Sequence, residues 1–582
     1  MALFAALLPA AVLAQPRLDW RPYGNLSVAD AAAAGPASGP VERVWYGSGG
    51  RLLIRASGGK TFETKDFETW IASDATPPEA GGQVRRAGGL TYAAGKALYR
   101  SDDGGNSWRN LTEFDNRSIL GGSPVDFAVS SEDAEDVSLA NEWGVWRSLD
   151  GGLTWNSLNL ALPNFPAARF AGPPDARAGL RVALSDDRDA VWAPGERRGW
   201  RLAESNGWRR DAVAAGGFVY VATGDGRLLS SGDGGASWRE FRLGDGVRPV
   251  ALFLDPREPR IALAAIDGPG AQLLRTVNGG LFWDDLTANL PRRGTRGVTA
   301  DVASGAIYAA TAEGVYLTVS SLREAAPPTA WRRVDGGLPA AGALDAMLDA
   351  EGNQLYVLLE GYGVWRALAP HRLADPKVVH AADYVRRAAA PGALLSVVGS
   401  RVDSARMGET EVPVLAATEA ESQIQVPFEA AGASVSLRLN AASGPGMQVE
   451  LPLRAAAPAI FVDRDGTPLI LDSERGVLLD AEMTARGGGR IQILAAGLGR
   501  VTPEWPSGLA APLDSPPRVN SEITVFLDRV PVPVLRATLA PGYVGFYLVE
   551  VELPAAVNPG PAELYLQAEG AESNRVTIYL QP

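Results

Sequence analysis

The side chains that could carry chemistry in this sequence are mostly carboxylates. The 582 residues include 67 Asp and Glu, no cysteine, and only two histidines, His371 and His380. Thiolate nucleophiles, thiolate metal sites and most histidine-based catalysis are therefore excluded. Paired carboxylates remain, and two of them flanking a sugar would suffice for glycoside hydrolysis. Spacing along the chain does not show which two would face each other, so we assign no catalytic residue.

The other candidate sites have simpler structural explanations. The acidic loops 131–136 and 185–189 offer oxygen ligands for calcium, but neither has the EF-hand pattern. We expect solvated loops and no cofactor. Trp143, Trp146 and Trp192 could stack on sugars, but the strand positions of Trp146 and Trp192 favour packing within blades. Both histidines are expected at the surface. Phosphate-binding loops and nucleophile elbows do not occur in the sequence.

One short pattern, S/T-x-D/N-x-G-x-x-W, recurs in the first 370 residues. Its side chains suit a structural turn: Ser, Thr and Asp can bond backbone N–H groups, and Gly accepts positive φ. The Trp is expected to pack between adjacent sheets. A shorter copy spans 64–70. The four good copies place these residues at the fixed positions: Ser101, Asp103, Gly105 and Trp108; Ser148, Asp150, Gly152 and Trp155; Ser231, Asp233, Gly235 and Trp238; Thr276, Asn278, Gly280 and Trp283.

This pattern resembles the Asp-box, or BNR, repeat of sialidase-type β-propellers. The resemblance implies an all-β propeller in which the boxes are structural and lie at the rim, away from the central pocket. The Phe/Tyr-Arg-Ile-Pro segment that precedes the first box in propeller sialidases is missing here, which disfavours sialidase activity. Other Asp-box propellers include xyloglucanases, which use two Asp residues across a groove, and photosystem II stability factors.

The spacing of tryptophans predicts the number of blades. Outer strands that carry Trp recur about every 44 residues from Trp20 to Trp331, which suits one four-stranded blade per unit. The last hairpin, near 354–365, has no such strand after it, whereas 18–21 resembles an outer strand without a hairpin. We therefore predict an eight-bladed propeller over 15–369, closed by the N-terminal strand. Seven blades is the alternative, because one unit lacks a proper box.

The composition changes after the propeller. Only one of the 15 Trp lies beyond Trp365. We interpret 370–377 as a linker, and Val/Leu-rich runs broken by Pro and Gly then predict two β-sandwich modules, 378–455 and 456–582. Several segments resemble an Ig-like C-terminal domain family of uncharacterised exported acidobacterial proteins, which implies an accessory domain without established activity. These segments include 390–399, 422–429, 495–503 and 539–547.

The N-terminus and the charge indicate the compartment and exclude some partners. Residues 1–14 are predicted to be a signal peptide, with small residues that suit cleavage after Ala14. No later stretch is long enough for a transmembrane anchor. We expect an exported monomer that is periplasmic, surface-retained or released. The formal charge of −13 argues against nucleic acid as a partner. Nearly all basic residues are Arg, which we attribute to a GC-rich genome rather than to a binding clamp.

These observations predict a non-catalytic β-propeller that binds a glycan or a protein at its central face, with Ig-like accessory domains. Loops from every blade of a propeller converge around one channel, which suits binding. The alternative function is a glycoside hydrolase with an Asp/Glu pair in the same pocket. An assembly factor is a third possibility, which a flat Arg-rich face without a cleft would favour.

Overall fold

The computed structural model describes residues 18–582 except 30, 80–81, 176, 271, 293, 326–329, 335, 442–445 and 464. The predicted signal peptide, 1–14, lies outside the described residues. Apart from two short 3₁₀ turns, η1 (Ser48–Gly50) and η2 (Pro370–Leu373), the regular secondary structure of the described residues consists of strands. The predicted all-β class is therefore confirmed.

The described part of 18–369 forms eight sheets in which consecutive strands pair antiparallel, as in propeller blades. The first four sheets consist of β3 (Val41–Tyr46), β4 (Leu52–Ala56), β5 (Thr61–Thr64) and β6 (Ile71–Ser73); β7 (Val84–Ala87), β8 (Leu90–Ala94), β9 (Leu98–Ser101) and β10 (Arg109–Asn110); β13 (Asp126–Val129), β14 (Val137–Asn141), β15 (Gly144–Ser148) and β16 (Asn156–Ser157); and β17 (Ala167–Phe170), β18 (Leu180–Leu184), β19 (Arg188–Trp192) and β20 (Trp200–Glu204).

The remaining four sheets consist of β21 (Ala212–Ala215), β22 (Phe218–Thr223), β23 (Arg227–Ser231) and β24 (Arg239–Arg242); β25 (Arg248–Leu254), β26 (Ala262–Asp267), β27 (Leu273–Thr276) and β28 (Asp284–Asp285); β29 (Thr295–Asp301), β30 (Ala306–Thr311), β31 (Gly314–Val319) and β32 (Arg332–Arg333); and β33 (Ala343–Leu348), β34 (Gln354–Leu359) and β35 (Gly363–Leu368) with β1 (Arg21–Tyr23). In addition, β2 (Val28–Ala29) pairs in parallel with β20, and β11 (Glu113–Phe114) forms a hairpin with β12 (Arg117–Ser118).

Burial changes across each sheet in the way that a packed blade requires. The middle strands β14 and β30 are buried along their whole length, whereas the outer strands β10 and β32 are exposed. Both faces of these middle strands are packed against neighbouring sheets, whereas the innermost strands β7 and β21 are partly exposed. Outer strands carry Arg and Asn, which face solvent.

The N-terminal strand completes the last sheet, as predicted. Strand β1 pairs antiparallel with β35, with Arg21 opposite Arg366 and Tyr23 opposite Val364. The strand begins at Arg21 rather than at Leu18, and Trp20 just before it is only 7% exposed. Without β1, the backbone of β35 would be an open edge.

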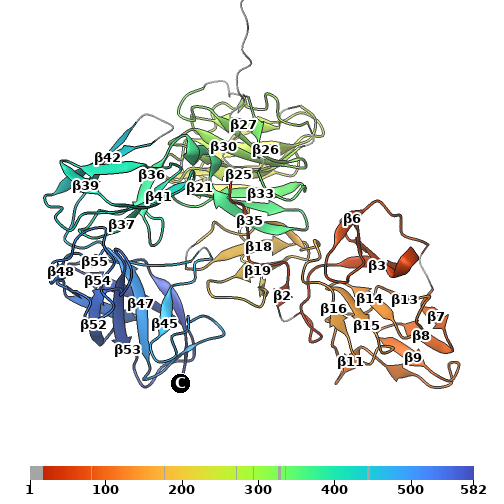
Figure 1. The fold of residues 1–582 in the computed structure, drawn as a ribbon. Helices are drawn as coiled ribbons and strands as arrows, with labels where there is room; N and C mark the ends of the chain where they lie inside the picture. The colour runs from red at the N-terminus through yellow and green to blue at the C-terminus, as the bar shows by residue number, and fades with distance from the viewer. Residues whose placement is uncertain are drawn as a thin grey trace, which may run out of the picture.

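The sheets do not follow one another in chain order around a single ring. Instead they pack in two stacks (Figure 1). The first stack runs from the β7–β10 sheet to β13–β16 and then β3–β6. The second runs from β21–β24 through β25–β28, β29–β32 and β33–β35 to β17–β20. The eight sheets are consistent with a β-propeller, and eight blades in one closed ring stays a prediction.

Equivalent contacts join the sheets that pack out of chain order. The Val44 N–H of β3 donates to an Asp126 carboxylate oxygen of β13 at 3.0 Å. In the second stack, the Phe170 N–H of β17 donates to an Asp345 carboxylate oxygen of β33 at 3.2 Å. In both cases an Asp on an innermost strand accepts a hydrogen bond from the innermost strand of the next sheet.

The C-terminal region forms two pairs of sheets. One pair consists of β36 (Lys377–His380), β37 (Leu394–Val398), β41 (Glu421–Gln425) and β40 (Val414–Ala417), against β39 (Thr410–Val412), β38 (Ser404–Met407), β42 (Ser434–Asn440) and β43 (Met447–Pro452). Leu395, Val397 and Leu437 are among the buried residues between them. The arrangement is that of a small sandwich, and its Ig-like character stays a prediction.

The second pair of sheets is larger. One sheet consists of β44 (Ala459–Ile460), β47 (Arg490–Ala496), β53 (Tyr547–Glu552), β52 (Val534–Leu539), β49 (Arg518–Val519) and β48 (Val501–Thr502), with β45 (Ile470–Asp472) on β47. The facing sheet consists of β46 (Ala485–Arg486), β56 (Val576–Gln581), β54 (Gly560–Ala568), β50 (Ile523–Leu527) and β51 (Val530–Val532), with β55 (Ala571–Glu572) on β54. Ile493, Val549 and Leu564 are central in its core.

Candidate functional site

The four Asp-box segments hold their own polar side chains in local hydrogen bonds. In the turn after β9, the Ser101 hydroxyl donates to Asp103 at 2.8 Å and accepts the Gly105 N–H at 2.8 Å. The Asp103 carboxylate also accepts the Ser107 N–H at 2.9 Å. A side-chain hydrogen bond from Ser107 is the largest cause that holds the pKa of Asp103 below its usual range. The polar groups of this box thus bond one another within the turn.

The other three boxes repeat this geometry. Ser148, Ser231 and Thr276 each donate to the Asp or Asn two residues later, at 2.7–3.0 Å. The same hydroxyls accept the N–H of Gly152, Gly235 and Gly280 at 2.7–2.9 Å.

The box glycines are required by the turn. Gly152 has φ of +93°, a region that L side chains rarely adopt, and an added Cβ would lie 2.5 Å from Leu111 of the neighbouring sheet.

The prediction that each box Trp packs between sheets holds for two of the four. Trp155 and Trp283 are 8% and 4% exposed, and the Trp155 indole donates to the Leu111 carbonyl of the preceding sheet in its stack. The prediction is wrong for Trp108 and Trp238, which are 43% and 45% exposed. The reason is the stacking order: β7–β10 and β21–β24 begin their stacks, so no preceding sheet covers these indoles.

Both histidines are buried, which corrects the expectation that they lie at the surface. His371, in η2, is 4% exposed, and its ring nitrogens lie 2.8 Å from the Tyr308 hydroxyl and 3.2 Å from Asp301. His380 is fully buried at the start of the C-terminal region, where its Nδ1 accepts the Ala382 N–H at 3.2 Å. The segment predicted as a linker is therefore packed, because η2 also buries Arg372 against Asn353.

The three tryptophans that were considered for stacking on sugars are buried. Trp143, Trp146 and Trp192 are at most 8% exposed; Trp146 and Trp192 lie on β15 and β19 as predicted, and Trp143 lies in the turn between β14 and β15. Of the acidic loops, Asp136 binds Arg147 at 2.7 Å and Asp189 binds Arg181 at 2.8 Å. Among the described residues, no group of three or more His, Asp or Glu side chains is arranged to hold a metal ion.

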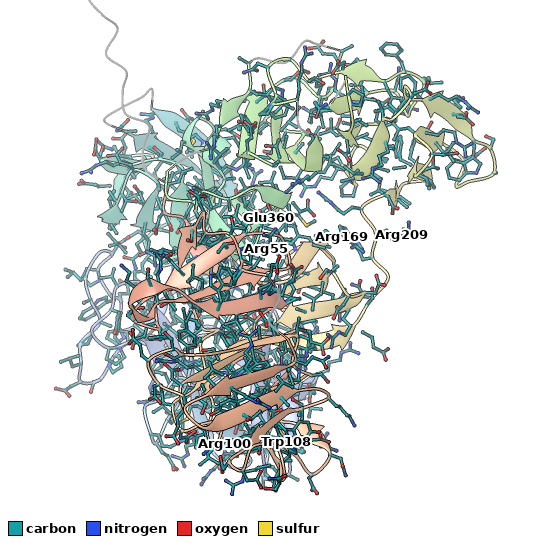
Figure 2. The ribbon with its side chains drawn as sticks, turned by 90° about the vertical axis from the view of Figure 1, so that its right-hand side faces the viewer. Arg55, Arg100, Trp108, Arg169, Arg209 and Glu360 are labelled. Atoms are coloured by element: carbon teal, nitrogen blue, oxygen red, sulfur yellow. The ribbon has the colours of Figure 1, made fainter. Side chains whose placement is uncertain are left out.

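A group of cationic side chains gathers where the two stacks meet. Glu360, in the turn between β34 and β35, lies 3.7 Å from the Lys60 ammonium and 3.8 Å from an Arg296 guanidinium nitrogen. Lys60 belongs to the first stack and Arg296, on β29, to the second. Arg55 lies on β4, opposite Thr61 of β5 and just before the turn that contains Lys60, and Figure 2 labels it near Glu360 in that view. Two cations, Lys60 and Arg296, thus lie within 4 Å of one carboxylate.

Three further arginines adjoin this group along β17 and the segment before β21. Arg169 donates to the Trp208 carbonyl at 3.2 Å. Arg209 is 67% exposed beside Asp211. Arg210 is buried, and it donates to Asp345 and to the Val298 carbonyl, both at 2.8 Å. Val298 lies on β29 two residues from Arg296. This strand therefore connects the cations around Glu360 with the three arginines near β21.

We call Arg55, Lys60, Arg169, Arg209 and Arg296 the cationic band. Glu360 is the ion-pair partner of Lys60 and Arg296, and Asp211 is that of Arg209. Figure 2 shows Arg55, Glu360, Arg169 and Arg209 in the middle of the molecule, well apart from Trp108 and Arg100 of the first box. Sequence reasoning missed the band, because its members are far apart in the chain and Arg is abundant everywhere.

The buried carboxylates near this junction already have cationic partners. Asp126 accepts hydrogen bonds from Arg43 and Arg85, each at 3.0 Å. Asp345 is paired with Arg210, and burial is the largest cause that raises the pKa of this carboxyl. Asp349 has its pKa raised to about 6 by burial, but it accepts the Asn353 N–H at 2.7 Å inside a turn. All three carboxyl groups thus take part in hydrogen bonds or ion pairs within the fold.

Comparison with known proteins gives structural similarities only. No family model matches the chain, and neither does any curated protein sequence. Solved structures with similarity include YCF48 from Cyanidioschyzon merolae, with 15% identity over 60% of this chain and 98% of that one, at a TM-score of 0.23. Another is the extracellular domain of the putative one-component system BT4673 from B. thetaiotaomicron, with 10% identity over 97% and 99% and a TM-score of 0.22.

A third similar structure is the GH74 xyloglucanase from Xanthomonas campestris, with 16% identity, coverage of 95% and 92%, and a TM-score of 0.20. At TM-scores this low, the structural similarity supports no statement about function. Within the described residues, no helix has the length and apolar character that crossing a membrane would need.

Proposed function

We propose that this protein is a non-catalytic binding protein whose propeller-type region takes an anionic glycan or an acidic protein segment. The observation that carries the proposal is the cationic band at the junction of the two stacks. The whole chain has a formal charge of −13, yet the band contains five cations, of which Lys60, Arg296 and Arg209 share the two carboxylates Glu360 and Asp211. Guanidinium groups bind carboxylates in a bidentate manner, so such a site favours ligands that carry them.

The distribution of carboxylates supports binding over hydrolysis. A glycosidase needs two carboxylates on either side of the scissile bond, one of which donates a proton. The buried Asp126 and Asp345 are instead held by arginines, and Glu360 lies between Lys60 and Arg296.

The other parts of the chain take supporting roles in this proposal. We propose that the four boxes are structural and that the C-terminal sandwiches are Ig-like accessory modules. We also propose that residues 1–14 direct export and are removed after Ala14, which N-terminal sequencing of the secreted protein would test. A monomer is proposed, with light scattering as its test.

The binding experiment uses immobilised polygalacturonate, neutral xyloglucan and an acidic peptide, and measures bound protein and released sugar together. We expect binding to the polyanions without sugar release, weakened about tenfold or more by Lys60→Glu. Lys65→Glu is the matched control, since it makes the same charge change on an exposed residue of the same chain segment. Released sugar would establish the hydrolase instead. Equal losses with both variants, or binding to xyloglucan alone, would refute the cationic band as the site.

A further inference from the structure

A groove of about 680 Å³ lies in the C-terminal region, on the first sandwich where it meets the second. This volume is in the range of ligand-binding sites. Strands β38 and β39 form one wall, Pro413 forms the corner, and Pro427, Glu429, Pro506 and Ser507 form the other wall. Its floor includes Ala405 and Val412, which are buried.

Hydrogen bonds hold the second wall in place. The Phe428 N–H donates to the Ser507 hydroxyl at 2.9 Å, and the Ser507 hydroxyl also lies 3.4 Å from a Glu429 oxygen. The Gly508 N–H donates to the Gln425 side chain at 2.6 Å. Prolines at three positions of the lining restrict the backbone further. The groove is thus preformed, so a ligand would not have to order it.

One wall of the groove is an open sheet edge. Strand β39 is the last strand of its sheet and pairs only with β38, with Arg406 opposite Glu411 and Met407 opposite Thr410 (Figure 1). A two-residue turn joins β38 to β39, so Met407 and Thr410, which flank it, exchange backbone hydrogen bonds. The next pair, Arg406 and Glu411, is a non-hydrogen-bonded pair. The backbone N–H and C=O of Glu411 therefore point away from β38, as an added strand would require.

The groove is also acidic. Its lining contains Asp403, Glu411 and Glu429, all exposed, and no Lys or Arg among the described residues. Two arginines lie outside the lining: Arg401 is 3.6 Å from Asp403, and Arg406, opposite Glu411, donates to the Glu409 carbonyl at the hairpin tip at 2.9 Å. Charge complementarity therefore favours a cationic occupant, in contrast to the cationic band of the propeller-type region.

We propose that this groove binds an extended, Lys- or Arg-bearing peptide segment of a partner protein, which pairs with the open edge of β39. The backbone of Glu411 supplies the hydrogen bonds of strand addition. The three carboxylates along the groove select basic side chains at alternate positions of the peptide. This site is separate from the proposed anion-binding site and has the opposite charge preference.

The test measures anisotropy of a fluorescent Lys-Val-Lys-Val-Lys-Val peptide with the full chain, and of a Glu-Val repeat as the opposite-charge probe. We expect saturable binding of the Lys peptide only, weakened at least tenfold by Glu411→Lys and by raised salt. Glu409→Lys is the matched control, because it makes the same charge change at the exposed hairpin tip outside the groove and should leave the affinity within about twofold.

Two more variants separate charge from strand pairing. Glu411→Gln removes the carboxylate and keeps the N–H, whereas Glu411→Pro also removes the outward N–H, a change that edge strands tolerate. We expect Glu411→Pro to lose clearly more affinity than Glu411→Gln. Absence of wild-type binding at low salt, equal effects of the 409 and 411 charge reversals, or equal effects of Gln and Pro would overturn the proposal. Polyanion binding through Lys60 is measured separately, so either site can fail alone.

Discussion

At the scale of single residues, the hydroxyl group of the Ser or Thr in each Asp-box stabilises the turn by hydrogen bonds. Ser148 is fully buried, and its hydroxyl both donates to Asp150 and accepts the Gly152 N–H. Ser148→Ala leaves this N–H and one carboxylate contact unsatisfied, so we expect unfolding free energy to fall by about 1–3 kcal/mol. Denaturant titration measures the change.

The control for this prediction exists within the chain. Thr276 occupies the equivalent position in the fourth box and makes the same two hydrogen bonds. Ser148→Thr is therefore expected to retain most of the stability that Ser148→Ala loses. If both variants lose the same amount, cavity or packing effects rather than the hydroxyl account for it.

A buried histidine makes stability depend on pH. Burial lowers the pKa of His380 to about 4, below the value near 6.5 of an unfolded chain. Between these values the unfolded chain binds the proton and the folded chain does not. The contribution of His380 is therefore present above pH 6.5 and is lost as pH falls toward 4, a change of about 3 kcal/mol.

His380→Asn tests this dependence, since an Asn oxygen can still accept the Ala382 N–H but does not titrate. Stability of both proteins is measured between pH 4 and 7, and the difference between them cancels the other titrating groups. We expect the free energy of unfolding of the variant, relative to that of the wild type, to increase as the pH falls across this range. A constant difference would show that His380 does not titrate differently in the two states.

At the scale of elements, the N-terminal strand protects a sheet edge. A chain that starts at Asn25 lacks β1 and exposes the backbone of β35, while one that starts at Gln15 retains it. The shorter chain also lacks Trp20, which is packed against Ala346 and Val357 in the same core. We expect it to aggregate and to melt at lower temperature, which light scattering and calorimetry would show. Equal behaviour of the two chains would mean that β1 contributes little to closing the sheet.

At the scale of the whole molecule, the stacking order predicts which tryptophans react. Trp108 and Trp238 are 43% and 45% exposed because their sheets begin the stacks. Hydroxyl-radical footprinting should therefore oxidise both well before Trp155 and Trp283. If all four indoles are equally protected, the sheets follow chain order in a closed ring, in which a preceding sheet would cover Trp108 and Trp238.

An ion pair between an exposed arginine and a buried carboxylate joins the propeller-type region to the second sandwich. Asp480 of the second sandwich has no exposed side-chain surface, and Arg197 of the β19–β20 loop lies 2.8 Å from it. The Gly195 N–H also donates to Thr467 at 2.8 Å across the same contact. Arg197→Ala removes the cation but leaves Asp480 its hydrogen bonds from the Glu482 and Met483 N–H groups, and solvent already screens the exposed Arg197. We therefore expect a loss of about 1–2 kcal/mol in the coupling of the two regions.

Calorimetry would detect this loss as a lower or newly separated unfolding transition. Arg198→Ala is the control, since Arg198 and its partner Glu482 are 74% and 42% exposed and such pairs contribute little. Identical effects of the two variants would show that the Asp480 contact does not couple the two regions.

Strands and turns could be predicted because they depend on neighbouring residues. Alternating apolar runs and box residues such as Ser101 and Asp103 act within a few positions of each other, so the chain alone indicates them. The closing strand near Trp20 was also predictable, because a hairpin without a fourth strand needs one from elsewhere. The two C-terminal sheet pairs follow from the same local patterns.

Only the tertiary structure decided the order of the sheets, the burial of the histidines and the cationic band. Asp126 and Asp345 each offer a carboxylate oxygen on an innermost strand, and Val44 and Phe170 each offer a backbone N–H. Either carboxylate could therefore accept a hydrogen bond from either N–H. The choice depends on packing of whole sheets, which no short pattern encodes. The band likewise joins side chains as distant as Lys60 and Arg296, and burial of a polar group depends on everything that surrounds it.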